Sequence, residues 1–339
     1  MPPRKSRKVP DILFEAKLPD IPIVKDICPF DAKSDANFLW MALQGGDREL
    51  EVVEVLTHRS NRQRQEIAAS FLECYGQDLL GLLKMQMGDH MHDVFNALFL
   101  LPEVHDAVSI HEAIQGNLPD EETLLEIICT RTNAELEALR DAYTTLYQRD
   151  LVEDVTSKSS GDFRRLMMAI ALGIRDEDTS DATDPIQLKD QARLEAQLLL
   201  EPISEKLPAS QVASTFVIML ANPSYAQLRM TLKEFERVAK AETEKIISRS
   251  IPPDISPALL TIVRIAKSKE GFFAENLQKA LRSEGQDKRL IRLIVSRSEK
   301  DLGNIRDEFQ KLYNTSLDTV ITGENICNYR SVLAAMIRG

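Results

Sequence analysis

LIRLIVSRSEKDLGNIRDEFQKLY, residues 290–313, is one of four similar segments in this chain. The segments align without a gap when four residue pairs are superimposed: Arg59-Ser60, Arg131-Thr132, Pro223-Ser224 and Arg297-Ser298. Twelve positions after the first residue of each pair stands an aromatic residue: Phe71, Tyr143, Phe235 and Phe309. Because chance matches rarely recur at one offset in four places, the sequence indicates an array of four repeats.

The spacing of the aligned pairs sets the repeat length and the domain boundaries. The pairs lie 72, 92 and 74 residues apart, so a longer connector follows the second copy. Residues 173–190, GIRDEDTSDATDPIQLKD, are polar and acidic and contain turn-forming residues, as expected of such a connector. We therefore expect an N-terminal arm at residues 1–34, repeats at 35–104, 105–172, 191–267 and 268–339, and a connector at 173–190.

Each repeat is predicted to contain five short helices. Leu, Ile, Ala, Glu, Lys and Arg fill the repeats, whereas glycine (13 residues) and aromatic residues (6%) are scarce, which is typical of an all-α protein. Between the second and third helices stand Arg59, Arg131 and Arg297, which we expect to cap carbonyls or to pair with acidic residues of the same repeat. Pro223 replaces this arginine in the third repeat, where we expect a different hydrogen-bonding arrangement.

The charge and hydropathy of the chain argue against several function classes. A net charge of -11 is unfavourable for binding nucleic acid. No apolar run reaches the roughly 18 to 20 residues of a bilayer-spanning helix, and no signal-peptide pattern follows Met1, so we expect a cytoplasmic protein. The cysteines show neither metal-ligand spacing nor a disulfide framework, and we expect them to be reduced: Cys28, Cys74, Cys129 and Cys327.

The N-terminal arm combines a basic tip with apolar positions, and its prolines favour an extended backbone. The tip could attract anionic lipid headgroups, or it could be a solvated terminus or a nuclear-localisation-like tract. Its basic residues are Arg4, Lys5, Arg7 and Lys8. Apolar side chains further along indicate that part of the arm docks on the body: Ile12, Leu13, Phe14, Leu18, Ile21, Ile23 and Val24.

The sequence contains no motif that predicts catalysis. A nucleotide-binding glycine-rich loop, a nucleophile elbow and a His-Glu-x-x-His zinc motif are all absent from it, so we do not expect an enzyme. The run Asp89-His90-Met91-His92-Asp93 could ligate a transition metal through its two imidazoles. A solvent-exposed loop is the simpler interpretation, because no second cluster of ligands accompanies the run.

Three of the segments resemble annexin sequences: THRSNRQRQEIAASF at 57–71, CTRTNAELEALRDAY at 129–143 and VSRSEKDLGNIRDEF at 295–309. The resemblance covers residues 35–339 and implies a curved helical disc, whose convex face binds anionic phospholipid membranes peripherally through calcium ions. Calcium suits this role because an acidic protein and an acidic membrane repel each other until a divalent cation shares oxygen ligands between them. The alternative function is a calcium-independent platform for cytoskeletal or other proteins on the same fold.

The resemblance also implies where the main calcium sites lie. In annexins, carbonyls of a K-G-x-G-T loop between the first two helices combine with a carboxylate of a later segment. At 27 positions after the aligned arginine, or its replacement, this chain has Gln86, Lys158, Ser250 and Glu324. Calcium takes about six to eight oxygens, usually including a bidentate carboxylate, so only Glu324 fits the annexin pattern.

The fourth repeat is therefore the predicted calcium site. Its loop, Arg282-Ser283-Glu284-Gly285-Gln286, retains a glycine, and the predicted ligands are the carbonyls of Leu281, Ser283 and Gly285 with the carboxylate of Glu324. The other loops depart further from the annexin pattern: Gln44-Gly45-Gly46-Asp47, Gln115-Gly116-Asn117-Leu118-Pro119 and Lys206-Leu207-Pro208. Glu49 and Glu121 occupy the positions of minor calcium sites. Acidic residues also favour helix starts through the helix dipole, which is the alternative interpretation for all three glutamates.

Overall fold

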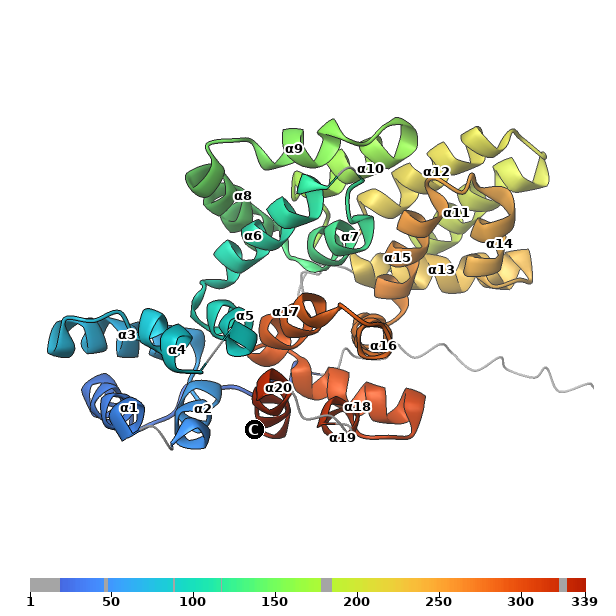
Figure 1. Cartoon of the computed structure of the whole chain (residues 1–339). Coiled ribbons are helices and arrows are strands. Elements are labelled where there is room, and N and C mark those ends of the chain that lie inside the picture. Colours follow the sequence, from blue (N-terminus) through green and yellow to red (C-terminus); the bar gives the residue numbers. More distant parts are fainter. Residues whose placement is uncertain (1–18, 46–47, 88, 117, 178–184, 323–327) are drawn as a thin grey trace, which may run out of the picture.

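The computed structural model describes residues 19–45, 48–87, 89–116, 118–177, 185–322 and 328–339. Within these ranges the chain forms twenty helices and no strand (Figure 1). The predicted all-α architecture of four repeats with five helices each is confirmed. No helix in the described ranges combines the length and the apolar character needed to cross a membrane.

The first two repeats occupy the N-terminal half of the chain. Repeat 1 comprises α1 (Ala32–Gly45), α2 (Glu49–Thr57), α3 (Asn61–Tyr75), α4 (Leu79–Met87) and α5 (Asp89–Phe99). Repeat 2 comprises α6 (Pro102–Gln115), α7 (Glu121–Thr130), α8 (Asn133–Tyr147), α9 (Leu151–Ser157) and α10 (Gly161–Ala171). Helix α6 therefore begins before residue 105, because Pro102 stands in its first turn, where a missing N–H costs nothing.

The last two repeats have the same helix order. Repeat 3 comprises α11 (Pro185–Ser204), α12 (Ala209–Ala221), α13 (Tyr225–Ala239), α14 (Thr243–Ser250) and α15 (Ser256–Lys267). Repeat 4 comprises α16 (Lys269–Arg282), α17 (Asp287–Ser298), α18 (Leu302–Tyr313), α19 (Leu317–Thr322) and α20 (Asn328–Arg338). Residues 185–190 of the predicted connector belong to α11, whose first turns are polar because they project into solvent.

The aligned residue pairs mark helix starts in the first three repeats, because their second members cap the third helix there. The Ser60 hydroxyl accepts a hydrogen bond from the backbone N–H of Gln63, and the Gln63 side chain accepts one from the Ser60 N–H. Thr132 and Glu135 form the same reciprocal capping box at α8. In repeat 4, Asp301 stands at the position of Gln63 and Glu135, and its carboxylate pairs with basic side chains instead. Helix α17 therefore continues to Ser298.

The recurring aromatic and aliphatic positions form the core. Phe71, Tyr143, Phe235 and Phe309 are all fully buried. The aliphatic positions 24 residues after the anchor are buried as well: Leu83, Val155, Ile247 and Ile321. Trp40 stacks on Tyr75 with ring centroids 4.4 Å apart, so it belongs to the packing of repeat 1. The identical offsets in the sequence thus reflect one packing arrangement that is used four times.

The junction arginines pair with carboxylates, as predicted. Arg59 donates two hydrogen bonds to Asp35 at 2.7 and 3.0 Å, and Arg131 donates two to Asp106 at 2.6 and 2.7 Å. Both acids lie on the first helix of their repeat, so each pair ties the second loop to that helix. Arg297 instead binds Asp301, four residues further on, at 2.6 Å.

In the third repeat, a residue of the predicted connector takes the place of the missing junction arginine. Arg175 donates hydrogen bonds to the carbonyls of Leu220 and Pro223 at 2.8 and 2.7 Å. Its guanidinium lies 4.4 Å from the ring centroid of Tyr225. The predicted difference in hydrogen bonding at Pro223 is therefore confirmed, and the cation comes from outside the repeat.

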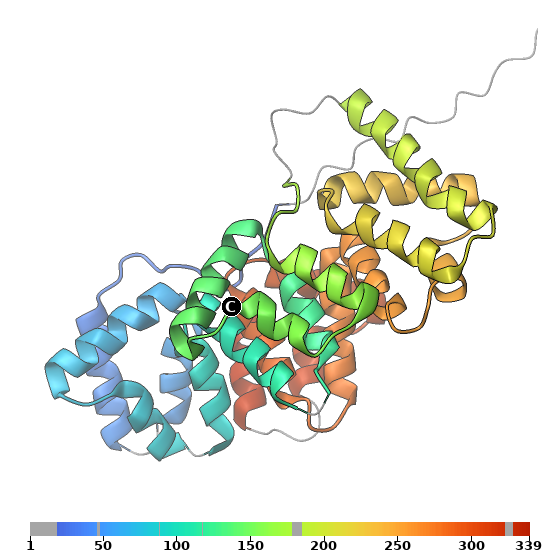
Figure 2. The ribbon, with the colours of Figure 1, turned by 90° about the horizontal axis from the view of Figure 1, so that it is seen from above.

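Repeat 1 and repeat 3 lie at opposite ends of the molecule, with repeats 2 and 4 between them (Figures 1 and 2). Helices α17 and α20 pack on α5, and α15 packs on α7. Between repeats 2 and 4, the buried side chains of Arg292 and Glu126 form an ion pair at 3.0 Å. Repeat 4 therefore holds the array together, because it contacts both N-terminal repeats.

The described part of the N-terminal arm joins repeat 4 to repeat 1. The Ile21 carbonyl accepts from the Gly303 N–H at 2.9 Å, and the Ile23 and Val24 N–H groups donate to the Ser298 carbonyl. Further along, Asp26 accepts from Ser60 and Arg62 of repeat 1. The expectation that part of the arm docks is met at these residues. The basic tip and the first apolar positions, up to Leu18, lie outside the described residues.

Candidate functional site

The loop after α16, residues 283–286, contains a glycine in the left-handed backbone conformation. Gly285 is exposed and has φ +73°, in the left-handed region that favours glycine, and no atom lies within 4 Å of the place that a Cβ would occupy. Ser283 is the exposed C-cap of α16, and Leu281 is half-buried in the last turn of that helix. Helix-terminal carbonyls lack helical partners, so this loop presents acceptors for a cation.

The predicted carboxylate ligand, Glu324, lies outside the described residues. The helices that follow the two predicted halves of the site are nevertheless in contact. They are α17, which follows the 283–286 loop, and α20, which follows Glu324 in the sequence. Asp287, in the first turn of α17, accepts a hydrogen bond from the hydroxyl of Tyr329, in the first turn of α20. This bond brings the start of α20 to the end of the 283–286 loop.

A cavity of about 360 Å³ lies between repeats 2 and 4 beside this loop. Gly285 and Gln286 line it from repeat 4, and Asp120 and Thr123 line it from repeat 2. His105 also lines it, and burial lowers the pKa of this imidazole to about 4, so it is neutral near pH 7. The loops of repeats 2 and 4 therefore open on the same side of the molecule.

The two minor candidates both stand at helix starts. Glu49 and Glu121 are the first residues of α2 and α7, and both are exposed. The N-cap of α7 is Asp120, which accepts from the N–H of Thr123, so capping does not need the Glu121 side chain. Desolvation by neighbouring protein atoms raises the pKa of the Glu121 carboxyl.

Lys158 of repeat 2 stands at the position that corresponds to Glu324 of repeat 4. Its side chain contacts the loop between α6 and α7. Its ammonium donates to the carbonyl of Ile114 at 2.6 Å and to the carbonyl of Gly116 at 2.8 Å. Sequence reasoning identified Lys158 as incompatible with calcium but did not predict these contacts. The sequence signal was a basic residue at a position where the annexin pattern has an acid.

Repeats 1 and 3 have no carboxylate at the position that corresponds to Glu324. In repeat 1, Gln86 lies exposed on α4, while Gly46 and Asp47 lie outside the described residues. In repeat 3, Lys206 itself adopts a left-handed conformation with φ +55°, and Ser250 ends α14. The amide and hydroxyl at these positions are weaker calcium ligands than a carboxylate.

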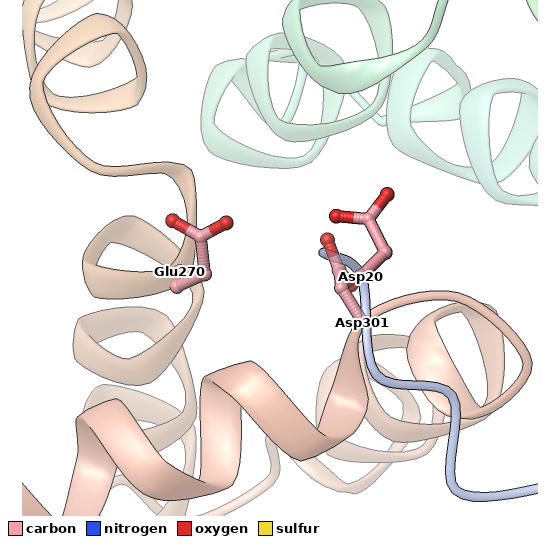
Figure 3. Close-up of side chains that lie close together, drawn as sticks. All are labelled: Asp20, Glu270 and Asp301. Carbon is pink, nitrogen blue, oxygen red and sulfur yellow. The ribbon is translucent and has the colours of Figure 1, made fainter. Parts of the chain in front are cut away.

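Two basic side chains pair with Asp301, the buried member of an acidic cluster at the docked arm. Asp20, Glu270 and Asp301 point toward one another and form the one group in the described residues that is close enough to share an ion (Figure 3). Lys269 lies 2.8 Å from Asp301, which also binds Arg297. Burial works to raise the pKa of Asp301, but the hydrogen bonds and charges of these two cations outweigh it and lower the pKa to about 2.

The histidine run Asp89–Asp93 is helical, not a loop, because α5 begins at Asp89. The His92 ring contacts Asp93 and the Asn96 amide. The side chains of Asp89 and His90 lie outside the described part of the structure, and Met91 is buried. The described side chains of this run do not form a metal site.

Comparison with known proteins agrees with the repeat architecture. A family model described as Annexin matches residues 34–98, 105–170 and 272–336. These ranges fall within repeats 1, 2 and 4. The unmatched repeat 3 is the one that carries Pro223 and lacks a glycine in its first loop.

Individual relatives and solved structures show the same likeness over nearly the whole chain. Annexin A7 of Homo sapiens is 36% identical over 316 residues, which cover 93% of this chain and 63% of that protein. Annexin B10 of Drosophila melanogaster is 36% identical over 320 residues, which cover 94% of this chain and 98% of that protein. The solved structure of annexin III has a TM-score of 0.85 at 30% identity and covers 95% of this chain and 98% of that one.

Proposed function

This chain is a member of the annexin family, and from that premise we propose that it binds anionic phospholipid membranes peripherally through calcium held mainly in repeat 4. Calcium-dependent phospholipid binding is the known property of the family. The net charge of -11 favours a bridging cation, because an acidic protein and an acidic bilayer repel each other.

The observation that carries the assignment to repeat 4 is the conformation of Gly285. Its left-handed backbone turns the exposed loop after α16 without steric cost. The proposed ligands are the carbonyls of Leu281, Ser283 and Gly285 with the carboxylate of Glu324. Water and a lipid phosphate would complete the coordination of a calcium ion, which takes about six to eight oxygens.

Repeat 1 and repeat 2 would contribute at most weak additional sites. Glu49 and Glu121 are exposed carboxylates next to loop carbonyls, which is the composition of a minor site. With few acidic ligands, half-saturation is expected at high calcium, on the order of 10⁻⁴ to 10⁻³ M, the range of weak extracellular-type modules.

The alternative function is a calcium-independent platform for cytoskeletal or other proteins. The contacts of Lys158 favour this alternative, because repeat 2 has a basic residue at the position where annexins have a calcium-binding carboxylate. The two functions differ in one measurable property, which is whether binding to vesicles or partners persists after calcium has been chelated.

Calorimetric calcium titration of the wild type and of Glu324→Gln tests the proposal. We expect Glu324→Gln to lose the calcium site while keeping its helical circular-dichroism spectrum, because a single carboxylate-to-amide change preserves the size of the side chain and usually has little effect on stability. Glu284→Gln is a control in the 283–286 loop, which supplies proposed carbonyl ligands, and we expect it to titrate like the wild type.

Co-sedimentation with phosphatidylserine-containing vesicles, in calcium and in chelator, tests the membrane part of the proposal. Calcium-dependent binding that Glu324→Gln weakens supports it. Equal calcium and vesicle binding by the wild type and Glu324→Gln would exclude the assignment to repeat 4, and equal binding in chelator would favour the calcium-independent platform.

A further inference from the structure

The first loops of repeats 2 and 4 begin in the same way. Helix α6 ends at Gln115 with Gly116 as its C-cap, and α16 ends at Arg282 with Ser283 as its C-cap. Ile114 and Gly116 therefore correspond to Leu281 and Ser283, the first two proposed carbonyl ligands of repeat 4. These are the two carbonyls of repeat 2 to which Lys158 donates.

We propose that the Lys158 ammonium takes the place of a calcium ion in the loop between α6 and α7. It holds this loop against the end of α9 at every calcium concentration. An ammonium and a calcium ion both satisfy converging carbonyl oxygens, since both are compact cations. The comparison with repeat 4 rests on the proposed function, whereas the test counts the calcium ions that repeat 2 binds.

The rest of the loop is closed independently of any ion. The N–H of Asp120 donates to the carbonyl of Ala113 at 2.8 Å, across the base of the loop. A Cβ added to Gly116 would lie 3.0 Å from the carbonyl oxygen of Leu118, so the chain is tightly folded there. Lys158, at the C-cap of α9, adds the connection between this loop and the other half of the repeat.

Charge prevents calcium from sharing the position with Lys158. A calcium ion bound to the Ile114 and Gly116 carbonyls would stand beside an ammonium, and like charges a few ångströms apart repel strongly even in a partly solvated site. The main calcium position of repeat 2 is therefore occupied by a cation of the chain itself, although two of the corresponding carbonyl ligands are present. A single change of Lys158 to a carboxylate should then create a calcium site.

The test is calorimetric calcium titration of Lys158→Glu, Lys158→Gln and the wild type. We expect Lys158→Glu to bind one more calcium ion per chain than the wild type. Lys158→Gln removes the ammonium without supplying a carboxylate, and we expect it to gain no site. The same comparison in a Glu324→Gln background isolates repeat 2, so the result does not depend on whether repeat 4 binds calcium.

Hydrogen exchange of the amides of residues 113–120 gives a second readout on the unmodified chain. We expect calcium to leave exchange unchanged in the wild type, Lys158→Gln to exchange at least several-fold faster, and Lys158→Glu to be slowed by calcium. A folded Lys158→Glu without an added site would overturn the proposal. So would a wild-type loop that calcium slows, or a Lys158→Gln loop that exchanges at the wild-type rate.

Discussion

Asp106→Asn removes the charge that balances a buried guanidinium in repeat 2. The side chains of Arg131 and Asp106 are 3% and 8% exposed, and two hydrogen bonds join them. Burial acts to raise the pKa of Asp106, yet Arg131 outweighs it and the net shift of the pKa is downward. Breaking a buried pair by removing one partner costs about 3–5 kcal/mol, because the remaining charge stays desolvated.

The same pair in repeat 1 is a matched control. Arg59 and Asp35 have the same bidentate geometry, but both side chains are 16% exposed. Water therefore reaches the guanidinium after Asp35→Asn, and we expect a loss of about 1.5–3 kcal/mol, the range for a hydrogen bond to a charged group. Replacing both partners in repeat 2, with Arg131→Met and Asp106→Leu, should cost less than Asp106→Asn alone.

Urea unfolding followed by far-ultraviolet circular dichroism measures these free energies. We expect Asp106→Asn to lower the free energy of unfolding most and Asp35→Asn to lower it less. The double replacement of the repeat 2 pair should also lower it less than Asp106→Asn does. Equal losses for Asp106→Asn and Asp35→Asn would refute the argument that burial sets the magnitude. A double replacement that is worse than Asp106→Asn would refute the argument that an unpaired charge causes the loss.

Two further predictions concern repeat 4 and the arm. Because the pKa of Asp301 is about 2 in the folded chain against an ordinary 3.8, its contribution is present above pH 3.8 and is lost as the pH falls toward 2. The wild type should lose about 2 kcal/mol of unfolding free energy over that range that Asp301→Asn does not lose; parallel pH profiles would contradict this. Gly303→Val should release the docked arm, since a Cβ there would lie 2.6 Å from the Ile21 side chain. Limited proteolysis should then cleave residues 19–24 faster than in the control Gly45→Ala, where no atom lies within 4 Å, and equal rates would rule out this contact as the anchor.

The repeats and their buried faces could be predicted from the sequence because local signals encode them. Ser60 and Thr132 begin helices through bonds to residues three positions away, and such caps are visible in the sequence. The aromatic positions at Phe71 and Tyr143 recur at one offset because the same helices pack in the same way each time. Helices α6 and α11 begin at prolines, Pro102 and Pro185, and a proline in a first turn is easily read from the sequence as part of a loop.

The partners of the charged residues depended on tertiary structure. Arg175 replaces the missing arginine of repeat 3 from 48 residues before Pro223. Lys158 meets Gly116 across 42 residues. Asp301 pairs with Lys269 of α16, and Ile21 of the arm docks against Gly303 beside it.

These contacts join segments that only the packing of helices brings together. A charged side chain has no periodic signature in the sequence, and its buried partner is fixed by which carbonyls and carboxylates the fold leaves without a local hydrogen bond. The sequence of this chain therefore determined that four annexin repeats form and that Lys158 cannot ligate calcium. Only the tertiary structure decided that the Lys158 ammonium lies against the carbonyls of the loop itself.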